Sequence, residues 1–257
     1  MTMKMTQMPH SNSPSETDRP EGMRLNKFVA HCGLCSRRKA ADWVKAGKIK
    51  VNGSVEKNPA VLIQSDDVVE YNGQQIELEE EKVYFLMNKP KNVITTKDDP
   101  QGRKTVMDLM GGMTDARIFP VGRLDRNTTG LLLLTNDGDL AKKLTHPSHE
   151  IQKVYEVELH TDVLPQDLDR LRAGLELEDG FAQVDAANYI ARKPKTWVSV
   201  QIHIGRNRIV RRLFDHLGYR VIKLDRVILA GLTKKGLGRG YVRTLREEEI
   251  RRLKHFH

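Results

Sequence analysis

An aspartate flanked by arginines lies a few residues before a strongly apolar segment. In GRLDRNTTGLLLLTNDGDL, residues 122–140, Asp125 has Arg123 and Arg126 as near neighbours, and four leucines follow at 131–134. The continuous apolar run predicts a buried central strand, so we expect Asp125 in the loop that enters a rigid element, where catalytic groups are well supported. A carboxylate in such a place can act as a nucleophile or as a base. The alternative is a surface ion pair with either arginine.

Two further segments carry side chains suited to a site. Strand alternation in KVYEVEL places Tyr155 with Val157 and Leu159 on a partly apolar face, where a core tyrosine would look the same. In residues 204–219, IGRNRIVRRLFDHLGY, helical spacing separates a buried side from a basic stripe made of Arg208, Arg211 and Arg212. This stripe can contact nucleic acid or face solvent, or one arginine can turn inward to hold a carboxylate.

Motifs for other kinds of chemistry are missing from the sequence. It contains no P-loop and no GxGxxG phosphate cradle, so we expect neither ATP nor NAD. Cys32 and Cys35 lie beside His31 without a second ligand pair at zinc-finger spacing, which favours ordinary reduced thiols. His146 and His149 flank a proline in a predicted loop, and we interpret them as structural or RNA-contacting. The sequence therefore predicts no metal and no cofactor.

The overall charge points to the class of partner. The chain has 257 residues with 43 Lys plus Arg against 34 Asp plus Glu, a formal net charge of +9. This excess predicts a polyanionic partner, nucleic acid rather than membrane. No window approaches the roughly 18 apolar residues of a membrane span, and the N-terminus lacks the apolar core of a signal peptide. We therefore expect a cytoplasmic protein. We also expect a monomer, because the sequence shows no additional apolar stripe that could form an interface with a second copy.

The N-terminal part divides into a tail and a small module. Residues 1–22 contain no aromatic, Leu, Ile or Val side chain, which predicts a disordered tail. The pattern of residues 23–79 predicts a short helix that ends at Gly33. A second helix follows, with Ser36 as its N-cap and Gly47 at its C-terminal end. The segments KIKVNGSVEKN and VVEYNGQQIEL each predict a hairpin turned at Asn-Gly. The prediction is a compact helix-helix-hairpin domain.

That small module is strongly basic. Between Arg24 and Lys50 the sequence has eight basic residues and one acid, Asp42. A surface tuned only for solubility would mix both signs, so we favour phosphate contacts with RNA or DNA. The predicted RNA-binding residues are Arg24, Lys27, Arg37, Arg38, Lys39 and Lys48 here, and Arg206, Arg208 and Arg212 in the larger domain.

Residues 83–257 predict a larger α+β domain after a linker at 79–82. Strands and short helices alternate irregularly with hairpin-length connections, which argues against a repeating βαβ unit. Asp139 is the predicted cap of the helix that follows the leucines, and Thr244 with Glu247 predicts a capping box for the last helix. The predicted strands cover 83–87, 131–135, 153–159, 197–204 and 219–224, and the predicted helices cover 139–145, 165–173, 207–217 and 245–255.

The motifs together resemble a known family. GRLDRNTTGLLLLTNDGDL, followed by HPSHEIQKVYEVEL and GRNRIVRRLFDHLGY, is similar to the RsuA/RluB family of ribosomal RNA pseudouridine synthases. RLNKFVAHCGLCSRRKAADWVKAGKIKVNG resembles the small RNA-binding module that this family shares with a small-subunit ribosomal protein. With MNKPKNVITTKDDPQGRKTVMDL at 87–109, the likeness covers nearly everything from Met23 onward. It implies a mixed, mainly antiparallel sheet in the larger domain.

The resemblance implies a role for each residue of the motifs. Asp125 matches the catalytic aspartate of the GRLD motif, and Tyr155 matches the tyrosine that packs on the target base. Arg211 matches the basic residue that pairs with the aspartate, and Arg123 matches an arginine that fills the space of the extruded nucleotide. The chain departs from the family before Gly205 and within the arginine motif: it has Ile204 where glutamate is common and Ile209 where glutamine or glutamate is common.

The implied reaction needs no cofactor. It breaks the uridine N1–C1′ bond, rotates the base and rejoins it through C5, after the nucleotide has been flipped out of the RNA. Asp125 would act as a nucleophile at C1′ or as a base on the ribose, and Tyr155 could also accept a proton. GRNRIVRRLF favours large-subunit (23S) ribosomal RNA as the substrate. The alternatives are 16S ribosomal RNA, tRNA, or a non-catalytic RNA-binding assembly factor; a nuclease is disfavoured because no metal-binding cluster is seen.

Overall fold

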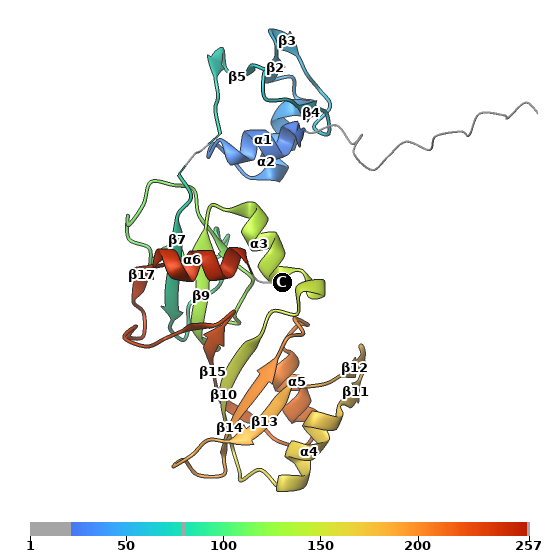
Figure 1. The fold of residues 1–257 in the computed structure, drawn as a ribbon, viewed down its shortest axis with the longest axis vertical. Coiled ribbons are helices and arrows are strands. Elements are labelled where there is room, and N and C mark those ends of the chain that lie inside the picture. Colours follow the sequence, from blue (N-terminus) through green and yellow to red (C-terminus); the bar gives the residue numbers. More distant parts are fainter. Residues whose placement is uncertain (1–21, 79–80, 256–257) are drawn as a thin grey trace, which may run out of the picture. The chain divides into compact units, whose positions relative to one another are not determined.

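The computed structural model describes residues 22–78 and 81–255. The chain divides into two compact units, Met1–Glu79 and Glu80–His257 (Figure 1). The predicted disordered tail, residues 1–22, lies outside the described residues except for Gly22. Within the described ranges no helix is long and apolar enough to cross a membrane.

The smaller unit packs two helices on short strands. Ser36 caps α2 as predicted, because its hydroxyl accepts a hydrogen bond from the Lys39 backbone N–H at 3.2 Å. Asn52 and Asn72 have positive φ and precede glycines that also have positive φ, as the predicted Asn-Gly hairpins require. The helices are α1 (Leu25–His31) and α2 (Arg37–Lys45). The strands are β1 (Met23–Arg24), β2 (Ile49–Val51), β3 (Ser54–Val55), β4 (Leu62–Ile63), β5 (Val69–Tyr71) and β6 (Gln74–Gln75), with β1 paired to β4 and the others in the order β3-β2-β5-β6.

The larger unit is built on a sheet with the order β13-β14-β10-β15-β9-β7-β17, to which β8 and β16 add at β9 and β15. Strands β9 and β15 pair in parallel and the other pairs of this sheet are antiparallel, so the predicted α+β class with a mainly antiparallel sheet is confirmed. The strands are β7 (Tyr84–Lys89), β8 (Phe119–Val121), β9 (Thr129–Thr135), β10 (Lys153–Leu159), β13 (Ala186–Tyr189), β14 (Trp197–Ile202), β15 (Val221–Leu229), β16 (Leu232–Thr233) and β17 (Val242–Thr244), and β11 (Leu175–Leu177) forms a separate hairpin with β12 (Gly180–Ala182).

Helices cover both faces of this sheet, which explains the leucine run. Leu131 and Leu133 of β9 face α3 and α6, whereas Leu132 and Leu134 face the core that includes α4 and α5. All four leucines are 0% exposed, because alternate side chains of a central strand enter opposite cores. The helices are α3 (Gly138–Thr145), α4 (Pro165–Ala173), α5 (Ile209–His216) and α6 (Glu247–Lys254), and a 3-10 turn covers Pro147–His149.

Two predicted helix caps were wrong by two residues. Asp137 rather than Asp139 caps α3, since the Asp137 carboxylate accepts the Leu140 backbone N–H at 3.0 Å. Thr244 does not begin α6, because it is still paired in β17 with Phe85 of β7. The helix begins at Glu247 instead, and the Arg246 backbone N–H donates to the Glu249 carboxylate at 2.9 Å. Strand pairing therefore overrides the local capping pattern.

Candidate active site

Strand pairing brings Asp125 and Tyr155 to one cleft. Asp125 lies in the loop before β9, and its backbone carbonyl accepts the Thr128 N–H at 3.0 Å. Tyr155 lies on β10, and β15 lies between these two strands. Arg226 of β15 is in register with Tyr155 on one side and with Gly130 on the other. Both Asp125 and Tyr155 line a cleft of about 390 Å³.

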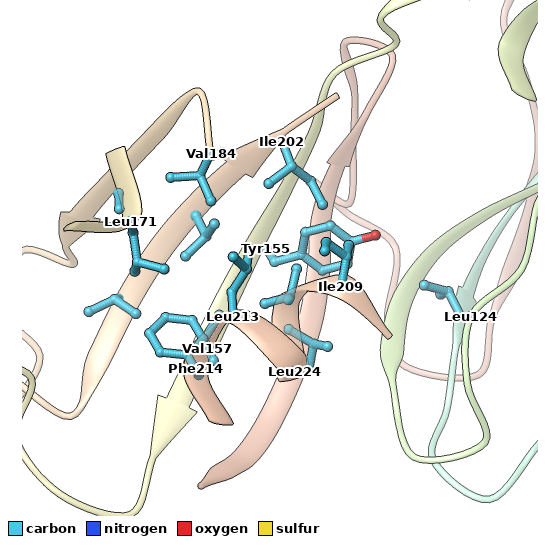
Figure 2. Close-up of a cluster of buried hydrophobic side chains, with 14 of the residues drawn as sticks. Leu124, Tyr155, Val157, Leu171, Val184, Ile202, Ile209, Leu213, Phe214 and Leu224 are labelled. Carbon is cyan, nitrogen blue, oxygen red and sulfur yellow. The ribbon is translucent and has the colours of Figure 1, made fainter. Parts of the chain in front are cut away.

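The Tyr155 side chain is held by the apolar core. The residue is 8% exposed, and Val157 and Leu159 on the same face are 0% and 2% exposed, as the alternation in KVYEVEL predicted. Figure 2 shows its ring within the cluster near Ile202 and Ile209, with the hydroxyl oxygen at the edge of the cluster. Ile202 and Ile209 also line the cleft. The arrangement offers a flat, rigid ring beside apolar walls, which suits a base that stacks.

The cleft is strongly positive. Of the described residues that line it, five are basic and one, Asp125, is acidic. Arg208 makes the direct contact, with 3.4 Å between its Nη1 atom and Oδ2 of Asp125. The basic residues are Arg123, Lys153, Arg206, Arg208 and Arg226.

The structure does not form the expected direct pair between Arg211 and Asp125. Helix α5 begins at Ile209, and Arg208 precedes it in the left-handed conformation, φ 47°, with its side chain paired to Asp125. Arg211 is 9% exposed, does not line the cleft, and donates to the Val221 carbonyl at 3.3 Å. Burial lowers the pKa of Arg211, as does Arg208, whereas the charge of Asp125 raises it. Arg211 thus acts on Asp125 through its charge and not through a direct bond.

Two other arginines that were predicted to contact RNA form hydrogen bonds within the protein. Arg212 donates to both carboxylate oxygens of Asp179, at 2.6 and 2.9 Å. Arg206 donates to the carbonyls of Gly180 and Phe181, each at 2.8 Å. The hydrogen bond from Arg212 lowers the pKa of Asp179 to about 2. These arginines therefore fix the turn between β11 and β12, and their contact with RNA stays a prediction.

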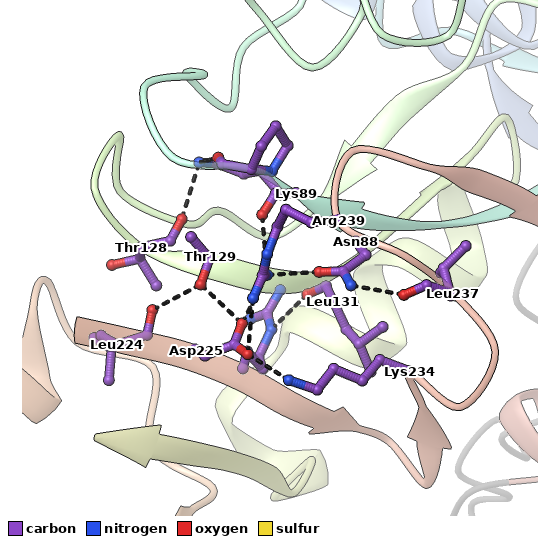
Figure 3. A network of polar contacts seen from close by, with 12 residues as sticks. Asn88, Lys89, Thr128, Thr129, Leu131, Leu224, Asp225, Lys234, Leu237 and Arg239 are labelled. Carbon is purple, nitrogen blue, oxygen red and sulfur yellow. Dashed lines mark hydrogen bonds and ion pairs between the residues drawn. The ribbon is translucent and has the colours of Figure 1, made fainter. Parts of the chain in front are cut away.

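A buried lysine supports the loop that carries Asp125. Lys89 ends β7, is 0% exposed, and donates to the backbone carbonyls of Pro90 and Thr128 at 3.1 and 3.0 Å (Figure 3). Burial lowers the pKa of Lys89 to about 8, although Asp125 opposes the shift. Sequence reasoning missed this residue. The available signal was a lysine that ends an otherwise apolar strand, since buried lysines need partners.

We expect Lys89→Met to slow the chemical step without weakening RNA binding. The change removes the hydrogen bonds that hold the loop after Asp125, and a displacement of about 1 Å can cost about 10²-fold in rate. The single-turnover rate of pseudouridine formation and the RNA dissociation constant check this. Lys91→Met, at an exposed residue two positions away, is the control and should behave as wild type. An unchanged rate in the Lys89 variant would remove the positioning role.

A polar network fixes the start of β9 against β15. The Thr129 hydroxyl donates to Asp225 at 2.8 Å, and Arg239 donates to both Asp225 oxygens at 2.9 and 3.0 Å (Figure 3). Lys234 forms an ion pair with the same carboxylate. Burial opposes ionisation of Asp225, but the hydrogen bonds from Arg239, Lys234 and Thr129 outweigh it and hold the pKa below its usual value. The network stiffens the strands that meet beside Asp125, and sequence reasoning did not find it.

The comparison with known proteins decides the family. Residues 83–216 match the family described as RNA pseudouridylate synthase, and residues 23–69 match the S4 domain. The chain belongs to the RNA pseudouridylate synthase family. The enzyme is 43% identical to the ribosomal large subunit pseudouridine synthase B of Bacillus subtilis, over 90% of this chain and 95% of the relative. It is 37% identical to an RNA pseudouridine synthase of Aquifex aeolicus, over 90% and 93% of the two chains.

A solved structure supports the same assignment. A crystal structure of a pseudouridylate synthase superimposes with a TM-score of 0.63 at 29% identity, covering 90% of this chain and 99% of that chain. The fold expected from the family resemblance is therefore confirmed for the synthase. Among the described residues, no group of three or more His, Cys, Asp or Glu side chains is arranged to hold a metal ion.

The S4 domain of the synthase presents the basic surface expected from the sequence. Arg24, Arg37, Arg38 and Lys48 are exposed, and none of them forms an ion pair with another described residue. Lys39 is also exposed and lies 5.5 Å from the Trp43 ring centre, and Lys27 is half-buried. Trp43 stacks on Tyr71 with 4.3 Å between ring centres. The domain thus combines open cations with a supported aromatic ring, a composition that suits RNA.

Proposed function

We propose that this synthase isomerises one uridine of 23S ribosomal RNA to pseudouridine, with Asp125 as the catalytic carboxylate. The observation that carries the proposal is the convergence of Asp125, Tyr155 and Arg208 on one positive cleft. The large-subunit substrate is supported by the relative from Bacillus subtilis, whose name assigns it to the large ribosomal subunit. Because ribosomal RNA is the substrate, we propose a cytoplasmic location. We also propose a monomeric enzyme, as the sequence pattern predicts.

The residues of the cleft have distinct proposed roles. The target uridine leaves its helix at a cost of a few kcal/mol, which stacking and backbone contacts offset. Its base packs on Tyr155, so that C1′ comes close to Asp125, which attacks C1′ or removes a ribose proton. Arg208 holds the Asp125 carboxylate through the contact at 3.4 Å, and Arg211 adds an attractive charge from the core. After the base has turned, C5 bonds to C1′ and the Asp125 carboxylate is regenerated. C5 then loses its proton, which the Tyr155 hydroxyl oxygen can accept while its own proton passes to water. We assign Arg123, which is exposed and lines the cleft, to the space that the nucleotide leaves.

Mapping pseudouridines tests the proposal directly. Ribosomal RNA from cells with and without this gene should differ at one position of 23S RNA, and the purified protein should restore that position without any added cofactor. A change confined to 16S RNA or tRNA would overturn the large-subunit assignment. If no position changes and the purified protein still binds ribosomal RNA, the protein is an assembly factor instead.

We expect Arg38→Glu in the S4 domain to weaken binding to ribosomal RNA by about tenfold at physiological salt, because it replaces a phosphate contact by a repulsion. The helix should tolerate the change, since an acidic residue in its first turn complements the helix dipole. Lys57→Glu, an equal charge reversal at an exposed residue of the same unit, is the control. Filter binding against salt concentration measures both. Equal losses in the two variants would show that only net charge matters.

A further inference from the structure

One arginine of the cleft has an unused hydrogen-bond donor. Arg226 is 4% exposed, and its Nε atom donates to the Leu131 carbonyl at 2.7 Å. Its Nη2 atom is buried and has no hydrogen-bond partner among the residues that the structure describes. The side chain lines the cleft beside Tyr155, its partner in the strand register. A buried donor without a partner is costly, so this group calls for an acceptor that the protein itself does not supply.

A lysine without a carboxylate partner among the described residues lies close by. Lys153 precedes Tyr155 by two residues on β10 and lines the same cleft. Its Nζ atom donates to the His203 carbonyl at 2.6 Å, but no described carboxylate forms an ion pair with it. Burial and the charge of Arg226 lower the pKa of Lys153 to about 8, and Asp185 opposes the shift. Asp185 itself is held by His203 at 2.6 Å.

A strand irregularity explains why these cations face the cleft together. The pairing of β10 with β15 shifts between Val154 and Tyr155, so that Val227 is an extra residue between the partners Arg226 and Ile228. Such bulges re-aim side chains and occur beside active sites. Lys153 also lines a neighbouring cavity of about 420 Å³, together with Arg206 and His146. Lys153 therefore stands where the two cavities adjoin.

We propose that Lys153 and Arg226 form a binding site for one backbone phosphate of the RNA, next to the extruded uridine. This inference rests on the proposed function and adds a ligand group to it. A phosphate fits better than a uracil carbonyl, because the buried Arg226 and the half-buried Lys153 need a negative charge, which a neutral oxygen does not supply. Charge-assisted bonds from both residues would fix the nucleotide in the cleft that Asp125 and Arg208 also line. The boundary between the two cavities gives the RNA strand room to enter and leave.

Neutralising single phosphates tests the site on the full-length protein. RNA that contains the mapped uridine is prepared with a methylphosphonate linkage on its 5′ side or on its 3′ side. One of the two linkages should weaken binding to the wild-type protein by about tenfold, the usual scale for a lost charge-assisted bond. If neither linkage changes affinity or rate, the proposed site is wrong, and this result needs no protein variant.

Lys153→Met then shows whether the same phosphate is involved. We expect this variant to bind unmodified RNA about tenfold more weakly than the wild type does. The sensitive methylphosphonate linkage should not weaken its binding further, because the substitution and the linkage remove the same interaction. Lys153→Arg should keep the sensitivity to the linkage, and Lys195→Met, at an exposed residue, is the control. Independent losses that add would overturn the proposal. Wild-type turnover on unmodified RNA is measured alongside, so that failure of the proposed function is recognised separately.

Discussion

Asp125→Asn is expected to lower the rate of pseudouridine formation by at least about a thousandfold, because the amide is neither a nucleophile nor a base at this position. The side chain keeps its shape, and the cleft keeps its five basic residues. RNA affinity should therefore stay the same or rise slightly, since one negative charge leaves a positive cleft. Single-turnover assays and filter binding on the same RNA measure the two quantities.

The control for this substitution is Asp162→Asn, an exposed carboxylate in the same unit. The Asp162→Asn variant should form pseudouridine at the wild-type rate. This result would show that removing a carboxylate elsewhere in the unit does not lower the rate. A rate within about tenfold of wild type in the Asp125 variant, far less than the loss of a catalytic group costs, would remove the catalytic role. A loss of RNA binding equal to the loss of rate would point to a structural role instead.

Gly130→Ala is expected to lower the free energy of unfolding of the larger unit by at least about 3 kcal/mol, because overpacking and backbone strain act together. A Cβ atom at Gly130 would lie 2.2 Å from the Arg226 carbonyl oxygen and 2.5 Å from its nitrogen. The residue also has φ +107°, a conformation that side chains disfavour. Strands β9 and β15 would have to separate next to Asp125, so activity should fall as well.

Gly180→Ala separates the two causes of this loss. Gly180 has φ +99°, close to that of Gly130, but no atom lies within 4 Å of the position of its Cβ. Its substitution should therefore cost only the backbone strain, about 1 to 3 kcal/mol. Chemical denaturation followed by circular dichroism measures both variants. Equal losses at the two positions would mean that the close approach of β9 and β15 is not what requires a glycine at 130.

Local signals in the sequence were sufficient for most elements. The alternation in KVYEVEL predicted the buried face of Tyr155, the leucine run predicted the central strand β9, and Ser36 predicted the start of α2. These signals worked because periodicity, capping and Asn-Gly turns depend on neighbours in the chain. The motifs around Asp125 and Arg211 indicated the family for the same reason, since motif spacing is read directly from the chain. The cap of α6 failed where a strand partner from β7 held Thr244.

Only the tertiary structure decided how the site is completed. Arg208 rather than Arg211 contacts Asp125, because α5 begins one residue after Arg208 and places Arg211 in the core. Arg226 comes to the cleft from β15, and Lys89 comes to the loop after Asp125 from β7. These two strands are far apart in sequence but both adjacent to β9 in the sheet. The sequence determined which residues form strands and helices and which motif carries the chemistry. Which cations face the carboxylate depends on strand order, a bulge and burial, and these arise from contacts between distant segments that no local pattern encodes.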